Sequence, residues 1–148
     1  MVNPFDVRTI LMEKHAQHVV LIHFPIALFI SGVSFDLLSR GKRDSQFAGT
    51  AYLNLSVAAA FVLPTIATGV LAWQFALERA KLEGLLLLHL VAALFAALLI
   101  IVSWWLHWQA RKSRTLLLPR YRVPIELLGV AVVTLTAHLG GFLSGVNR

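Results

Sequence analysis

The chain has 148 residues, of which 58% are hydrophobic and 14% charged, whereas about 25% of residues are charged in typical soluble domains. This composition excludes a soluble globular protein and predicts a single integral membrane domain over residues 1–148. The formal net charge is +6, but the basic residues cluster at helix ends and no recognition module is visible, so we expect the lipid bilayer as a partner and no nucleic acid.

Five helical segments are predicted in chain order. Residues 1–17 mix apolar and charged side chains, which predicts a short interfacial helix. Four apolar runs follow, at about 18–38, 48–77, 85–108 and 123–146, each with roughly the 20 residues needed to cross a membrane. Short loops make neighbouring spans antiparallel, so the predicted fold is all-α, a transmembrane four-helix bundle. No internal repeat is evident.

The basic residues predict an orientation. Five lie on the side of the termini (Arg8, Lys14, Arg79, Lys81 and Arg148) and eight on the other side (Arg40, Lys42, Arg43, Arg111, Lys112, Arg114, Arg120 and Arg122). The positive-inside rule therefore places both termini outside the cytoplasm.

The histidines are the main candidates for chemistry. Of the six, five gather at the predicted outer end (His15, His18, His23, His89 and His138), and His107 lies at the opposite end. At 1.5 Å per residue, three of them lie on the order of 6–12 Å inside the hydrocarbon edge: His23, His89 and His138. Ionisable side chains at such depth usually face the bundle interior and mark a site. The alternative is that each is a packing histidine bonded to a backbone carbonyl.

Convergent imidazoles on facing helices suit b-type haem with two histidine ligands. We expect His23, His89 and His138 as ligand candidates and His18 as a fourth, with His23 and either His138 or His89 as the first axial pair. Four ligands would permit one or two haem b groups. The absence of cysteine excludes covalent c-type attachment, disulfides and Cys-ligated metals.

Small residues near these histidines would admit a macrocycle. Gly140 and Gly141 follow His138, and Gly32 and Gly84 are further positions of close approach. Copper or zinc is a second candidate for the same four histidines. However, no cysteine exists and no carboxylate lies beside the histidines within a span.

Helix geometry restricts the ligand sets. His18 and His23 are five residues apart, about 140° around a helix, so they cannot ligate one iron from one face. His107 shares a face with His89 but lies about 27 Å away and has no histidine partner at its level. We therefore expect a cofactor only toward the outer end.

Two carboxylates lie within the spans near the cytoplasmic ends, Asp36 and Glu126. We expect Asp36 to be a helix-end residue that contacts Arg40 or a loop. With so few carboxylates, a proton relay like those of pumps is not favoured.

The stretch His18-Val-Val-Leu-Ile-His23-Phe-Pro-Ile-Ala-Leu28, with Asp36-Leu-Leu38 after it, resembles the opening helix of an uncharacterised family of small four-helix bacterial membrane proteins. His138-Leu-Gly-Gly141 resembles the closing helix of that family, and His89 falls where it tends to carry a histidine. Val19 stands where the family often has proline. Relatives linked to Rieske-type or c-type cytochrome modules imply electron transfer.

The expected function is that of a small b-type cytochrome in a bacterial inner membrane, with periplasmic termini. It would relay electrons between a quinone and a periplasmic cytochrome c or Rieske-type partner, as an electron-transfer protein more than a stand-alone enzyme, and we assign no catalytic residue. Two alternatives stay open, a copper- or zinc-binding or transport protein and a structural subunit. The oligomeric state also stays open.

Overall fold

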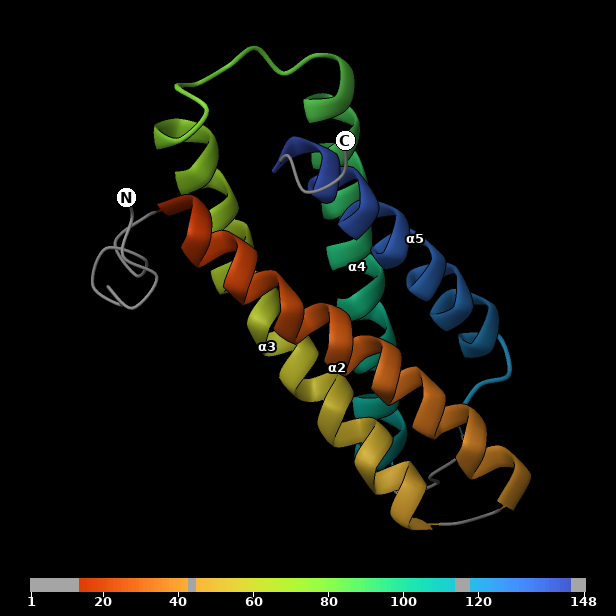
Figure 1. The fold of residues 1–148 in the computed structure, drawn as a ribbon. Coiled ribbons are helices and arrows are strands. Elements are labelled where there is room, and N and C mark those ends of the chain that lie inside the picture. Colours follow the sequence, from red (N-terminus) through yellow and green to blue (C-terminus); the bar gives the residue numbers. More distant parts are fainter. Residues whose placement is uncertain (1–13, 43–44, 114–117, 145–148) are drawn as a thin grey trace.

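The computed structural model describes residues 14–42, 45–113 and 118–144, which form four helices and, within those ranges, no strand (Figure 1). The helices are α2 (Lys14–Lys42), α3 (Ser45–Phe75), α4 (Gly84–Lys112) and α5 (Arg122–Leu143). All four are long and apolar enough to cross a membrane. The predicted all-α transmembrane bundle is therefore confirmed. Residues 1–13 of the predicted interfacial helix lie outside the described residues, and residues 14–17 begin α2.

The helices pair as two hairpins. α2 packs on α3 and α4 packs on α5, and the hairpins meet through contacts of α3 with α4 and of α2 with α5 (Figure 1). α2 and α4 therefore occupy opposite corners of the bundle and run in the same direction. The start of α2 and the end of α5 lie at one end, which we call the His18 end, and the opposite end is the Asp36 end.

The two hairpins repeat one another, although the sequence alone predicted no repeat. Adding 71 to a residue number in the first hairpin gives its counterpart in the second, so that His18 corresponds to His89 and Gly69 to Gly140. Burial follows the same offset, because both members are buried in each of these pairs: Phe29 and Ile100, Gly32 and Ser103, Asp36 and His107, Ala51 and Arg122, Leu55 and Glu126, Ala58 and Gly129, Val62 and Val133. Parallel repeats of this kind are related by an axis along the membrane normal.

The centre of the bundle is apolar. Its core consists of Phe29, Val33, Leu55, Ala58, Val62, Ala96, Ile100 and Val133. Hydroxyl side chains along the helices donate to the carbonyl four residues earlier, as those of Ser34, Ser56 and Thr134 do. These bonds satisfy polar groups that the bilayer cannot solvate.

The two ends of the bundle differ in packing. At the His18 end, residues 17–24, 63–75, 84–95 and 134–144 together contain only two buried residues, Ala72 and Leu139. In the same region α3 and α4 are joined by a connection of turns and irregular backbone over residues 76–83 (Figure 1). The inward faces of the helices are therefore only partly covered at the His18 end, whereas at the Asp36 end they bury a group of charged side chains.

Two glycines that the sequence marked as positions of close approach have different roles. A Cβ on Gly32 would lie 3.0 Å from Leu55 Cγ, so this glycine does let α2 approach α3. A Cβ on Gly84 would meet nothing within 4 Å, and its φ of +56° shows that the turn into α4 requires the glycine.

Gly129 offers a direct test of the packing between hairpins, because a Cβ there would lie 2.7 Å from Cζ of the fully buried Phe29. We expect Gly129→Ala to lower the free energy of unfolding by about 1–3 kcal/mol through overpacking. The matched control is Gly49→Ala, whose Cβ meets only an Arg111 side-chain nitrogen at 3.9 Å. Denaturant unfolding in detergent micelles measures both, and equal stability of the two variants would contradict the described packing.

Candidate functional site

A buried ion pair joins the first described helix to the last. Arg122 of α5 donates to Asp36 of α2 through Nε at 3.2 Å and through Nη2 at 2.9 Å to each carboxylate oxygen. Arg122 Nη1 also lies 3.4 Å from the carbonyl oxygen of Pro119. The relative exposures of Asp36 and Arg122 are 1% and 5%. Such a bidentate pair neutralises both charges. It also fixes the relative orientation of the two side chains, because guanidinium and carboxylate are both planar.

A second polar pair lies directly beside the first. His107 Nε2 of α4 is 2.9 Å from Glu126 Oε1 of α5 and 3.8 Å from Asp36 Oδ1. Both residues are buried, and Glu126 has no exposed surface. Asp36, His107, Arg122 and Glu126 therefore form one four-residue cluster drawn from three helices, which we call the charge cluster.

The sequence missed this cluster. Asp36 was expected to contact Arg40 or a loop, and its partner is Arg122, 86 residues away. The sequence placed Arg122 in the loop before the fourth span, whereas the structure makes it the first residue of α5. His107 has a carboxylate partner, Glu126, which the sequence did not predict. One signal was available, since Arg122 and Glu126 are four residues apart and so share a helix face. Nothing in the sequence showed that α2 and α4 present Asp36 and His107 to that face.

Two buried polar atoms in or near the charge cluster remain unpaired. Glu126 Oε2 and, one turn before His107, Ser103 Oγ are buried and have no hydrogen-bond partner among the described residues. Asp36, His107 and Glu126 each place one potential metal ligand within 4.8 Å of the others. However, Arg122 occupies both oxygens of Asp36, so a divalent cation would have to share that carboxylate with a guanidinium. The donor set therefore does not fit a metal ion.

At the opposite end, His18 and His89 share one feature of their surroundings, a glycine on the neighbouring helix. His18 Nδ1 lies 3.2 Å from Thr68 Oγ1, and its Cε1 would be 3.0 Å from a Cβ on Gly69. His89 Cε1 would be 3.2 Å from a Cβ on Gly140. Each imidazole thus lies against a glycine of the neighbouring helix in its own hairpin.

The other expected ligands lie elsewhere on their helices. His23 is exposed, and its Nδ1 is 2.6 Å from the carbonyl oxygen of Val19. His138 is exposed and meets the edge of the Phe142 ring at a centroid distance of 4.9 Å. Gly141 is half-buried, and the side chain of His15 lies outside the described residues. The structure therefore sets His18 and His89 apart from His23 and His138.

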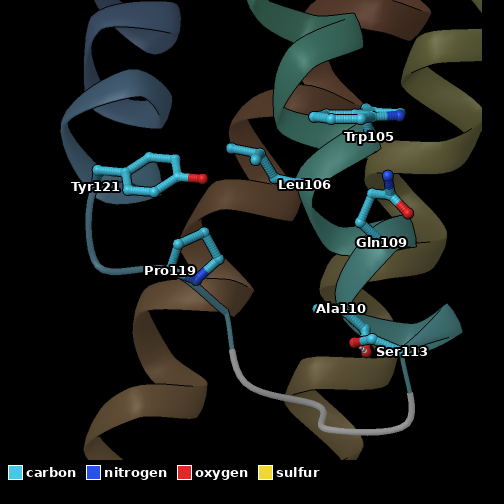
Figure 2. Close-up of a pocket in the computed structure, with 7 residues that line it drawn as sticks. All are labelled: Trp105, Leu106, Gln109, Ala110, Ser113, Pro119 and Tyr121. Atoms are coloured by element: carbon cyan, nitrogen blue, oxygen red, sulfur yellow. Dashed lines mark hydrogen bonds between the residues drawn. The ribbon is translucent and has the colours of Figure 1, made fainter.

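A surface pocket of about 380 Å³ lies between α4 and the start of α5 at the Asp36 end (Figure 2). It is lined by Trp105, Leu106, Gln109, Ala110, Ser113, Pro119 and Tyr121. In Figure 2, Pro119 and Tyr121 lie beside Leu106 of α4. Pro119 also accepts the bond from Arg122, so the pocket wall touches the charge cluster.

Comparison with known proteins supplies a family and no activity. A family model described as "Predicted membrane protein (DUF2231)" matches residues 14–147. No curated protein and no solved structure matches the chain. The resemblance to an uncharacterised membrane protein family is thereby confirmed, and any function must be argued from the chain's own residues.

The Asp36–Arg122 pair predicts a clear pattern in a double-mutant cycle. Asp36→Leu leaves a buried guanidinium without its partner and should lower the free energy of unfolding by about 3–5 kcal/mol. The double variant Asp36→Leu/Arg122→Met replaces both charges by apolar groups and should recover most of that loss. Unfolding in detergent measures each corner of the cycle. Additive losses in the double variant would show that the two residues do not depend on each other.

Proposed function

The chain belongs to the DUF2231 family of predicted membrane proteins, and we propose that it is a small b-type cytochrome whose His18 and His89 bind one haem b between the two hairpins. It would be an electron-transfer protein, and its cofactor would lie at the His18 end of the bundle.

One observation carries this proposal. Asp36 of α2 and His107 of α4 approach each other across the bundle, with 3.8 Å between Oδ1 and Nε2. His18 precedes Asp36 by 18 residues and His89 precedes His107 by 18 residues. Eighteen residues are five helical turns, so each histidine lies on the same helix face as its inward-pointing partner, about 27 Å along the axis. This register favours His18 and His89 as the pair that faces the bundle axis, in place of the pairs with His23.

The surroundings of the two rings support ligation. Ligating histidines usually direct their second ring nitrogen to a carbonyl or a hydroxyl group, which fixes the ring plane. His89 Nδ1 is buried and has no hydrogen-bond partner among the described residues. On the other hairpin, the His18 ring is oriented by Thr68. The glycines against which both rings lie allow close approach to the neighbouring helix.

The packing at the His18 end supports a planar apolar group as the occupant. Twelve consecutive residues, 84–95, contribute no buried residue to the bundle, and Leu86, Ala92 and Ala93, which share the helix face of His89, are only half-buried. A macrocycle between His18 and His89 would cover the inward faces that the hairpins leave open, and its edges would contact aliphatic side chains.

When bound, haem supplies one-electron chemistry, and the protein supplies its orientation and an apolar surrounding. Arg79 and Lys81, in the connection at the His18 end, would offer positive charge to the propionates. The distribution of basic residues favours a periplasmic His18 end in a bacterial inner membrane. A periplasmic cytochrome c or Rieske-type protein and a quinone are the proposed electron partners.

Visible spectroscopy tests the proposal. We expect the purified protein, expressed with haem supplied, to show sharp α and β bands on reduction, as bis-histidine haem does. His18→Ala and His89→Ala should each lose these bands, because one axial ligand is removed. His23→Ala and His138→Ala are the matched controls and should keep them, since both side chains are exposed.

Other results would count against this assignment. A colourless protein would refute the cytochrome, and metal analysis for copper and zinc would follow. Loss of the bands in His23→Ala or His138→Ala, with His18→Ala unaffected, would show that the ligands are on the other helix faces.

The glycines beneath the two rings give an independent prediction. Gly69→Leu and Gly140→Leu place a branched side chain where the imidazole now lies, within about 3 Å of Cε1, and should reduce the haem content of the purified protein severalfold. Gly49→Leu, at the Asp36 end, should leave the haem-to-protein ratio unchanged. A ratio that stays constant in all three variants would contradict the proposed position of the cofactor.

A further inference from the structure

We propose that the His107–Glu126 pair is a proton-binding site, which takes up and releases one proton from the aqueous phase at the Asp36 end of the bundle. The site lies at the opposite end from the proposed haem and does not depend on it.

The charges within the cluster require such a proton. The pair Asp36–Arg122 is neutral as a whole, because a carboxylate and a guanidinium cancel. With a neutral imidazole and an ionised Glu126, the charge cluster carries a net charge of −1 inside the bundle. Uptake of one proton, to give imidazolium with carboxylate or imidazole with carboxylic acid, brings the net charge to zero. A buried charge without a compensating partner costs free energy. The protonated cluster, with zero net charge, avoids this cost, whereas the deprotonated cluster carries it.

The pair has an atom that can accept the proton. Glu126 Oε1 contacts His107 Nε2 at 2.9 Å, whereas Glu126 Oε2 is buried with no hydrogen-bond partner among the described residues. An ionised carboxylate oxygen in that position is unsatisfied. Protonation converts Glu126 Oε2 into a hydrogen-bond donor. Ser103 Oγ, on the same helix as His107, is a second buried polar atom without a hydrogen-bond partner among the described residues.

No other charged group of the described residues enters the cluster. α2 contributes Asp36, and α4 contributes Ser103 and His107. α3 presents buried Ala51 and Leu55 at the positions that correspond to Arg122 and Glu126 in the repeat. The nearby titratable group of α3, Tyr52, lies under the guanidinium of Arg111 at 4.3 Å from the ring centroid. The proton therefore has the His107–Glu126 pair as its acceptor.

Access is expected from one side only. Toward the His18 end, the apolar core with Phe29, Ile100 and Val133 separates the cluster from the remaining histidines. Toward the Asp36 end, the pocket of Figure 2 borders Pro119, whose carbonyl contacts Arg122. Tyr121, Gln109 and Ser113 give this pocket polar groups that water can contact.

Infrared difference spectroscopy between two pH values tests the site on the complete protein in lipid nanodiscs. From about pH 3 to about pH 10, a range that brackets the ordinary pKa values of carboxyl and imidazole groups, we expect the wild type to show a difference band from Glu126 or His107. Both Glu126→Gln and His107→Gln should abolish this band, because each removes one half of the pair.

Matched control variants are Glu83→Gln and His23→Gln, whose side chains are exposed at the other end. They should remove different bands and keep that of the pair. A pH difference spectrum that is unchanged in both Glu126→Gln and His107→Gln would overturn the proposal.

A measurement on the wild type covers the case in which these variants fail to fold. Nuclear magnetic resonance of protein labelled in the glutamate carboxyl carbons and histidine ring nitrogens should show one close carbon–nitrogen pair. We expect the shifts of that pair to change in a single step over the same pH range. A close pair whose shifts stay constant throughout would refute proton exchange at this site.

Discussion

The contact between Asp36 and Arg122 determines how the two hairpins fit together. Neither charge can remain buried alone, so the first described helix must present one face to the last at a fixed height. This contact brings His107 and Glu126 within hydrogen-bonding distance at the same level. An α-helix keeps the same face inward at positions that are five turns apart. The contacts at the Asp36 end therefore also decide which faces of α2 and α4 point inward at the level of His18 and His89.

The internal repeat explains why the two ends can serve different purposes. At the His18 end two pairs of counterparts are identical, His18 with His89 and Gly69 with Gly140. At the Asp36 end the counterparts differ, because Asp36 corresponds to His107 and the apolar Leu55 to Glu126. Identical groups on opposite sides of an axis suit a symmetric ligand with two axial positions. Dissimilar groups suit a charge-balanced cluster, in which an acid must meet a base.

The sequence predicted the fold well, because membrane spans depend on apolar runs that are local. It also placed His18 and His89 near one end, since depth in a helix follows from residue number alone. It did not predict which histidines face inward: His23 was preferred, although the structure leaves it exposed. Helix rotation depends on contacts between distant segments, and the one that sets it joins residues 86 positions apart.

The charge cluster was missed for a related reason. Single ionisable residues near helix ends look like interfacial residues when each is considered on its own, as Asp36 did. Only the packing shows that three helices direct such residues to a common point and away from water. The repeat was hidden similarly, because Ala51 and Arg122 share a position and a buried environment but no chemical similarity.

The separation of the two proposed sites limits how strongly they can influence each other. At about 27 Å and an effective dielectric constant of about 20, one unit charge changes the energy of another by about 0.6 kcal/mol. This is less than half of the roughly 1.4 kcal/mol that corresponds to a tenfold change in affinity. Direct electrostatics would therefore couple haem oxidation only weakly to proton uptake at His107 and Glu126. Any stronger coupling would have to pass through the packing of the hairpins, and the Asp36–Arg122 contact is where proton uptake and hairpin packing meet.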